Sequence, residues 1–397
     1  MKKKVLHLFY FILFITSISS CSKDHDDRDD AQNQYLVSSQ LVAEVGADEI
    51  KSRLPQAAPL ISSSVKAYKI AYKTEFPKGT SITASGLVII PDKAPQTLTL
   101  LGYQHGTITT QDEAPSAYKP IGNKEAYLGG TIGASLAKGY IVVMPDYIGF
   151  GDSKQIQHLY QEKASLASAC LDMLKAAKEF ANEKKLETKK EIRLLGYSEG
   201  GYATMALHQT IQEQGDEWFK VEASYPAAGA YDMVGTAQWV VSRNEDLPPG
   251  ATSFYLWTLL TYNNLYQMNI PLTDMIKPNH AAAVAQAISQ GNPLAAPIPN
   301  NPHELFTTAF IQGIQNGTNM PFMAALERNN VYNWKPASPL TLFHAVADKI
   351  VPVLNAEKAQ QTMNALGGNV KYISLGNMGH REAIPNYITT VLARLAF

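Results

Sequence analysis

The stretch Glu191 to Gly201, EIRLLGYSEGG, constrains the fold of this chain more than any other. An apolar run leads into Gly196-Tyr197-Ser198-Glu199-Gly200, and a segment rich in helix formers follows. Glycine at both ends of the pentapeptide leaves room for a sharp turn, where a Cβ would collide with strand or helix. The pattern predicts a strand, a strained turn that presents Ser198, and a helix whose N-terminal amides face the same point.

Strands and helices alternate along most of the chain. Strands are expected at 65–74, 82–91, 98–104, 140–144, 192–197, 221–227, 340–347 and 370–375. Helices are expected at 125–138, 163–185, 198–213, 354–366 and 383–395. The first two strands should form an antiparallel hairpin. The rest predict an α/β fold with a mostly parallel sheet and helices on both faces.

One segment, residues 229–335, shows no clear strand and is rich in aromatic residues between Trp239 and Met268. It is predicted to be a helical insertion between two core strands. It could be a subdomain with its own small core, or a lid whose aromatic residues line an acyl or aryl pocket. The two interpretations are compatible.

A reactive serine needs a base to take its proton. His380 is the predicted base, because it lies in the loop after the strand at 370–375 and can reach over Ser198. The other histidines are assigned to structural or solvated positions. His344 should be packed or hydrogen-bonded in a strand, and His158, His280 and His303 should be solvated or structural.

The base needs an acid that orients it. Asp348 follows the strand at 340–347 and is predicted to accept the Nδ1 hydrogen of His380. Asp146 is the main alternative, but it precedes the serine and lies in a sequence expected to fix a loop. Because these residues follow the carboxyl ends of predicted parallel strands, they should meet at one edge of the sheet.

An ester-hydrolysing site also needs amides that bind the oxyanion. One should be the amide of Glu199, directly after the serine; no catalytic role is expected for the Glu199 side chain. The second should come from the loop after the strand at 98–104, with Thr107 preferred and His105 as the alternative. The His105 side chain is expected to be structural.

The N-terminus has the pattern of a targeting segment. Three lysines precede a short apolar run, and small polar residues lead to Cys21, which resembles a bacterial lipoprotein signal. We expect a signal peptide at 1–20 and lipidation of Cys21, with an ordinary secretory signal as the alternative. An acidic tether and linker should follow at 21–50. A disulfide between Cys21 and Cys170 is a minor alternative to the lipid.

Charge and composition limit the partners. The net charge of −1 gives no reason to propose a nucleic-acid partner. His25 lies among aspartates, but a solvated spacer is favoured over a metal site. No metal or cofactor is predicted. The expected partners are a small-molecule or lipid ester and, through the anchor, a membrane.

From about Leu98 onward the chain resembles the α/β-hydrolase superfamily and, within it, the secretory lipase family. The matching stretches are YQHGT, AYLGG, MPDYIGFG, GYSEGG, ADKIVP and the late Gly379-His380, with the triad in the order serine, acid, histidine. Glu199 stands where glutamine is more typical. The resemblance implies the α/β-hydrolase fold over 51–397, a helical lid at about 229–335, and hydrolysis of acylglycerols or simpler esters.

The sequence thus predicts a lipid-anchored serine esterase or lipase. Its expected location is the bacterial cell envelope, at the outer membrane, with the face undecided. A polysaccharide or feruloyl esterase at the cell surface is the enzymatic alternative, and a non-catalytic surface binding lipoprotein is the alternative from another class. A peptidase is disfavoured because no device for holding a peptide terminus is recognised. Acyl and alcohol specificity and the oligomeric state stay open.

Overall fold

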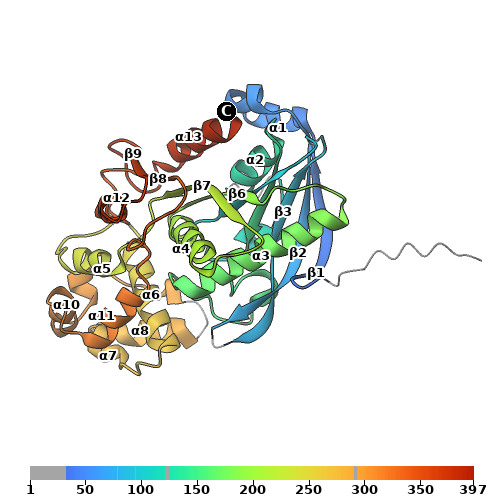
Figure 1. The fold of residues 1–397 in the computed structure, drawn as a ribbon. Coiled ribbons are helices and arrows are strands. Elements are labelled where there is room, and N and C mark those ends of the chain that lie inside the picture. Colours follow the sequence, from blue (N-terminus) through green and yellow to red (C-terminus); the bar gives the residue numbers. More distant parts are fainter. Residues whose placement is uncertain (1–32, 78, 94, 121–124, 290–292) are drawn as a thin grey trace, which may run out of the picture. The chain divides into compact units, whose positions relative to one another are not determined.

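The computed structural model describes residues 33–397, except 78, 94, 121–124 and 290–292 (Figure 1). The predicted signal peptide, Cys21 and most of the predicted tether lie outside the described residues. The strands are β1 (Leu36–Val45), β2 (Val65–Phe76), β3 (Thr80–Pro91), β4 (Thr99–Gln104), β5 (Tyr140–Pro145), β6 (Glu191–Tyr197), β7 (Lys220–Ala227), β8 (Leu340–His344) and β9 (Val370–Ser374).

The α-helices of the described chain fall into two groups. Those of the α/β part are α1 (Ala47–Arg53), α2 (Ile132–Ser135), α3 (Lys163–Glu183), α4 (Glu199–Gln214), α12 (Leu354–Ala365) and α13 (Ile384–Ala396). Those between β7 and β8 are α5 (Met233–Val241), α6 (Ala251–Leu265), α7 (Leu272–Met275), α8 (Pro278–Ser289), α9 (Pro302–Leu305), α10 (Thr308–Gln315) and α11 (Met320–Arg328). A short π-helix, Ala126–Thr131, leads into α2.

The strands form one 9-stranded sheet in the order β1-β2-β3-β5-β4-β6-β7-β8-β9. The pairs β1–β2, β2–β3 and β3–β5 are antiparallel, and every pair from β5 to β9 is parallel. The predicted hairpin is β2–β3. The mostly parallel sheet is confirmed, and it places the carboxyl ends of β4, β6, β8 and β9 at one edge.

Successive residues of the central strands pack on opposite faces of the sheet. Leu100 and Ile141 belong to one buried cluster with α3 and α4, whereas their neighbours Leu101 and Val142 belong to another with α2 and α13. Because both faces are covered by helices, the central strands are apolar throughout, as buried parallel strands usually are. The helices packed on both faces hold the central strands, and therefore their carboxyl ends, in place.

The edge strand β1 corrects the prediction of a linker as far as residue 50. Residues Leu36–Val45 pair with β2 along the whole strand, with two irregularities in register. Only Leu36 and Val45 are buried, while Val37 and Leu41 are largely exposed. Main-chain pairing rather than side-chain burial holds this strand, so its sequence lacks the alternation that marks a half-buried strand.

The segment between β7 and β8 is helical, as predicted. Figure 1 shows helices α5 to α11 gathered together at one end of the α/β part, away from α13. They have their own apolar contacts, among them the packing of Phe310 against Phe306 and Phe322. We call residues 229–335 the helical insertion.

Among the described residues, no helix is both long and apolar enough to cross a membrane.

Candidate active site

The backbone at Ser198 has the strained geometry that the sequence predicts. Ser198 has φ 59° and ψ −121°, values that a residue with a side chain rarely adopts, and it lies between β6 and α4. A Cβ on Gly200 would lie 2.0 Å from the Gln104 carbonyl oxygen, and one on Gly196 would lie 2.3 Å from the Gly200 carbonyl oxygen. Glycine is therefore required sterically on both sides of the turn.

Three predicted side chains meet at the carboxyl edge of the sheet. His380 follows β9, and its Nε2 lies 2.9 Å from the Ser198 hydroxyl oxygen. Its Nδ1 lies 2.6 Å from the Oδ2 atom of Asp348, which follows β8. The structure thus places serine, imidazole and carboxylate in one hydrogen-bonded chain, although they are far apart in the sequence.

The carboxylate of Asp348 is held in its charged form. Its Oδ1 atom accepts hydrogen bonds from the amides of Ile350 and Val351 at 2.8 and 2.9 Å. Burial alone would raise the pKa of Asp348, but hydrogen bonds from His344 and His380 outweigh it and lower that pKa well below its usual range. Asp348 is therefore an anion facing His380 throughout the range in which histidine titrates.

His344 is buried inside β8, as predicted, and contributes to this anion site. Its Nε2 lies 2.8 Å from the Val351 carbonyl oxygen and 3.3 Å from the Asp348 carboxylate. Asp146, the alternative acid, has other partners. It accepts from the Ser85 hydroxyl at 2.5 Å and from the Ser116 amide at 2.7 Å, so it fixes a loop.

The loop after β4 is arranged around a buried carboxylate that the sequence did not reveal. Glu125 accepts the Gly106 amide at 2.9 Å and the Tyr103 hydroxyl at 3.2 Å. The Gly106 amide therefore already has an acceptor and is not free to bind an oxyanion. The amides of Thr107 and Glu199 have no hydrogen-bond acceptor among the residues described, and Thr107 with His105 as alternative stays the prediction for the second oxyanion donor.

The His105 side chain occupies a structural position in the same loop. Its ring nitrogens lie 2.7 Å from the Gly106 carbonyl oxygen and 3.2 Å from that of Asp146. The ring stacks on Tyr147 at 4.1 Å between centroids, and the Tyr147 hydroxyl donates to the His105 carbonyl. These contacts fix the backbone that carries the candidate oxyanion donors.

A second histidine–carboxylate pair lies on the other side of the turn. The Nε2 atom of His158 is 2.7 Å from Glu199 Oε1, and its Nδ1 is 2.7 Å from the Ile148 carbonyl oxygen. Both side chains are buried, with exposures of 5% and 1%. The Glu199 side chain therefore has a partner that the sequence did not indicate. Of the two alternatives given for His158, a solvated side chain is wrong and a structural one is correct.

The helical insertion contacts this edge directly. The Tyr255 hydroxyl donates to the carbonyl of Ile350, two residues from Asp348. Trp257 stacks on Tyr160 at 4.4 Å, and the Tyr160 hydroxyl is 2.9 Å from that of Thr107. Helix α6 therefore contacts the loop of the predicted acid directly and reaches the loop of the predicted oxyanion donor through Tyr160.

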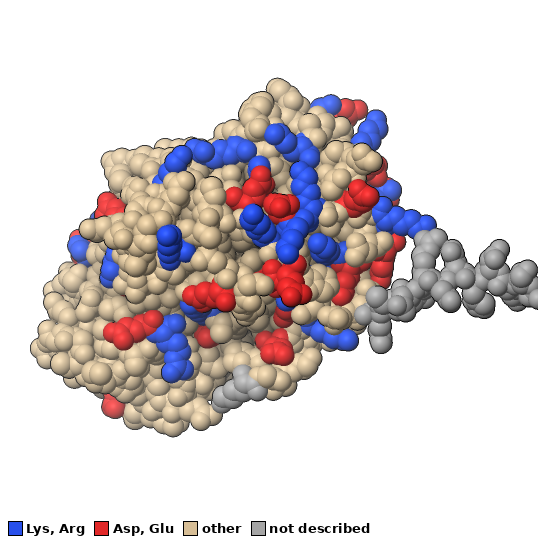
Figure 2. Space-filling model, in the orientation of Figure 1, with Lys and Arg blue, Asp and Glu red and all other residues tan. Residues whose placement is uncertain are grey.

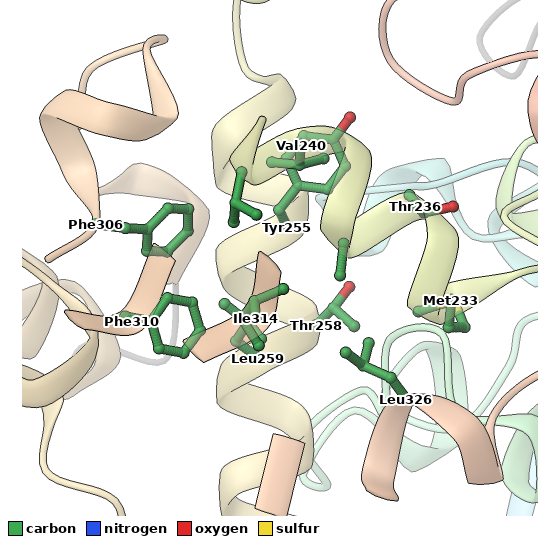
Figure 3. Close-up of a pocket in the computed structure, with 12 residues that line it drawn as sticks. Met233, Thr236, Val240, Tyr255, Thr258, Leu259, Phe306, Phe310, Ile314 and Leu326 are labelled. Carbon is green, nitrogen blue, oxygen red and sulfur yellow. The ribbon is translucent and has the colours of Figure 1, made fainter. Parts of the chain in front are cut away.

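Inside the insertion, helices α5, α6, α10 and α11 enclose a small cavity of about 50 Å³ (Figure 3). Its lining is almost entirely apolar and includes Val240, Leu259, Phe306 and Phe310. Figure 3 shows the Phe306 and Phe310 rings projecting from one side toward Leu259 on α6. Of the aromatic residues between Trp239 and Met268, Tyr255 lines this cavity, whereas its two phenylalanines come from outside that stretch. The lid that would carry an acyl or aryl pocket therefore stays a prediction.

In the part of the chain that the structure describes, no group of three or more histidine, cysteine, aspartate or glutamate side chains is arranged to hold a metal ion.

Comparison with known proteins places this site in a class. The secretory lipase family model matches residues 128–214, which span β5, α3, Ser198 and α4. A candidate hydrolase from Legionella pneumophila is 26% identical with a TM-score of 0.80, covering 91% of this chain and 97% of that chain. No curated protein matches the sequence significantly.

Two further solved structures share the fold. The rice cell wall degrading esterase LipA from Xanthomonas oryzae is 23% identical with a TM-score of 0.77, over 92% of this chain and 97% of that chain. Candida antarctica lipase A is 17% identical with a TM-score of 0.63, over 87% and 77%. The fold is that of the α/β-hydrolases, and the matches together support a carboxylic ester hydrolase. The predicted resemblance to the secretory lipases is confirmed over the matched segment.

Proposed function

We propose that this protein is a serine-dependent ester hydrolase that acts through an acyl-enzyme. The observation that carries the proposal is the chain of hydrogen bonds from Ser198 through His380 to Asp348, built on a strained turn. A strained turn held by steric necessity suits a nucleophile that must stand clear of the sheet.

In the first half of the reaction, His380 Nε2 takes the Ser198 proton as the hydroxyl oxygen attacks the ester carbonyl carbon. Asp348 keeps the Nδ1 hydrogen of His380 in place and stabilises the imidazolium. The amides of Glu199 and Thr107 receive the developing oxyanion. The imidazolium then gives its proton to the departing alkoxide, which leaves as the alcohol, and the acyl group stays on Ser198.

In the second half, water attacks the acyl carbonyl and His380 takes its proton. The tetrahedral intermediate collapses, the C–O bond to Ser198 breaks, and the imidazolium returns a proton to the serine oxygen. The carboxylic acid is released, and the protein has returned to its starting state. No residue beyond those named is needed for the proton transfers.

The helical insertion is proposed to serve as a lid. The Tyr255 and Trp257 contacts support this role, because they attach α6 to both loops that border Ser198. The apolar cavity between its helices supports binding of an acyl or aryl group. A polysaccharide or feruloyl ester is the second candidate substrate, and the observation favouring it is a groove rich in carboxamide side chains between loop 149–158 and α6.

Turnover of p-nitrophenyl butyrate tests the proposal. The wild-type protein should hydrolyse it, and Ser198→Ala should lower kcat by about 10⁴ to 10⁶-fold. A fluorophosphonate probe should label wild type and leave Ser198→Ala unlabelled. Unchanged turnover in the variant would remove Ser198 from its role, and a wild type that neither turns over nor labels would favour the non-catalytic binding lipoprotein.

We also propose that the protein is anchored in the bacterial cell envelope through a lipid on Cys21. The support is the N-terminal sequence alone, with its lysines, short apolar run and following cysteine. Cys21→Ala should move the protein from the membrane to the soluble fraction of the cell. Retention of that variant in the membrane fraction would overturn the anchor.

A further inference from the structure

A groove of about 1060 Å³ lies beside the candidate active site. One wall comes from the loops at 109–111 and 149–158, and the other from α6 and α8. We propose that this groove binds a neutral oligosaccharide, so that the ester cleaved at Ser198 is one carried by a sugar chain. This inference rests on the proposed function and names its substrate class.

The groove is rich in carboxamide side chains. Those that are exposed along it are Gln111, Gln155, Gln157, Asn264, Gln267 and Asn269. A carboxamide both donates and accepts hydrogen bonds without charge, which matches the hydroxyl groups of a sugar. The Asn264 amide donates to Gln157 Oε1 at 3.5 Å, so carboxamides of the two walls approach each other.

The groove is nearly uncharged. Within the described residues, Lys154 is the sole lysine, arginine, aspartate or glutamate that lines it. The visible face of the helical insertion is likewise mostly uncharged (Figure 2). An ionic ligand would have to give up its hydration without gaining a counter-charge, which is costly, whereas a neutral polyol would not. Charge therefore favours a neutral sugar over an anionic or cationic one.

Aromatic side chains give the groove an apolar surface. Phe150 and Trp257 line it next to the carboxamides but are only 5% and 6% exposed, and the partly exposed Leu260 extends the surface along α6. The C–H face of a sugar ring is apolar and can pack against such a surface while its hydroxyls reach the surrounding amides. An alkyl chain could use the same surface but would offer the amides no hydrogen bonds.

The groove adjoins the site through two short connections. His158 lines it and is hydrogen-bonded to Glu199, the residue after the nucleophile. Trp257 lines it and stacks on Tyr160, whose hydroxyl lies 2.9 Å from that of Thr107. A sugar chain in the groove would thus lie next to side chains that contact the residue after Ser198 and the loop of Thr107.

Calorimetric titration of the full-length Ser198→Ala protein tests binding without turnover. The probes are linear hexasaccharides of xylose, glucose and mannose. At least one should bind with a Kd below about 1 mM, and the double variant Gln157→Ala/Asn264→Ala should weaken that binding at least 10-fold. Gln361→Ala, which changes an exposed glutamine on α12, is the matched control and should bind unchanged.

Absence of binding for all three sugars, or equal binding by the double variant, would overturn the inference. So would displacement of the bound sugar by octanoate, which would identify an acyl site instead. If the double variant melts early, Gln267→Ala alone replaces it, with at least a 3-fold weakening expected.

Turnover separates this inference from the proposed function. With Ser198 restored, the double variant Gln157→Ala/Asn264→Ala should raise KM for the acetylated form of the hexasaccharide that binds, with kcat unchanged. Its turnover of p-nitrophenyl acetate should stay unaltered. Equal losses on both substrates would overturn the inference. Sugar binding by a protein that turns over no ester would instead defeat the proposed function alone.

Discussion

Two histidine–carboxylate pairs flank Ser198, and they differ in where the second ring nitrogen points. In the His380–Asp348 pair that nitrogen lies 2.9 Å from the serine hydroxyl. In the His158–Glu199 pair it lies 2.7 Å from the carbonyl oxygen of Ile148, which can only accept. An imidazole paired with a carboxylate can therefore exchange a proton with Ser198 in the His380–Asp348 pair. In the His158–Glu199 pair the same two groups only link two backbone segments by hydrogen bonds.

Removing each imidazole in turn should give the largest difference between the pairs. His380→Ala should lower kcat/KM for p-nitrophenyl butyrate by about 10⁴ to 10⁶-fold, because among the described residues no other base contacts the Ser198 hydroxyl. His158→Ala should cost no more than about 100-fold. Equal losses in the two variants would contradict a proton-transfer role for His380 and a purely structural role for His158.

Neutralising the catalytic-side carboxylate should have the next largest effect. Asp348→Asn keeps an oxygen for His380 Nδ1 but no longer stabilises the imidazolium, so kcat should fall by about 10³ to 10⁴-fold. Asp274→Asn, at an exposed aspartate of α7, is the control and should leave kcat unchanged. A loss of less than 10-fold at Asp348 would contradict its orienting role.

The folded-state pKa of Asp348 lies below its unfolded value, so its contribution to stability is present above about pH 4. That contribution is lost as pH falls through the folded pKa. The difference in unfolding free energy between wild type and Asp348→Asn should therefore shrink on acidification below pH 4. Urea unfolding at several pH values measures it.

Breaking the structural pair should show in stability more than in rate. Glu199→Ala leaves the buried Nε2 of His158 without its carboxylate partner and should lower the free energy of unfolding by about 3–5 kcal/mol. Glu199→Gln retains an oxygen facing Nε2 and should cost less than about 2 kcal/mol. Urea denaturation compares them; a Gln variant as unstable as the Ala variant would mean that charge, not the hydrogen bond, holds the pair.

His208 is another buried histidine, and among the described residues it has no carboxylate partner, which sharpens the contrast. Burial lowers its pKa to about 3, and its Nδ1 faces the Ser224 hydroxyl at 2.8 Å. Because the folded pKa is below the unfolded one, the stabilising contribution is present above about pH 6.5 and is lost as pH falls toward 3. Wild type should lose up to about 3 kcal/mol more than His208→Gln between pH 7 and pH 4.

Much of the fold and the candidate triad could be predicted because both have local patterns. Ser198, Asp348 and His380 each follow a recognisable apolar strand, and strands of one direction end at one edge of a sheet. The steric need for Gly196 and Gly200 is likewise written into the pentapeptide. The order of the three residues along the chain and their positions after strand ends were sufficient to predict that their side chains meet.

What could not be predicted has no local pattern. His158 and Glu199 are separated by 41 residues, and neither has neighbours that mark it for pairing. Glu125, directly before a short π-helix, accepts the Gly106 amide from 19 residues away. Strand β1 is held by main-chain bonds at an edge, so its side chains carry little signal. Such contacts depend on how elements pack, which residue type and spacing do not specify.

Helix α13 contacts the backbone next to the turn that carries Ser198. The Tyr387 hydroxyl in α13 accepts the Gly196 amide at 2.9 Å and donates to the Tyr225 carbonyl at 2.7 Å. The Tyr197 hydroxyl donates in turn to the His380 carbonyl. During synthesis, then, the turn at Ser198 emerges from the ribosome long before the residues that fasten it. The strained turn can reach its final geometry only after α13 has been synthesised and packed, so the candidate nucleophile depends on the folding of sequence far from it.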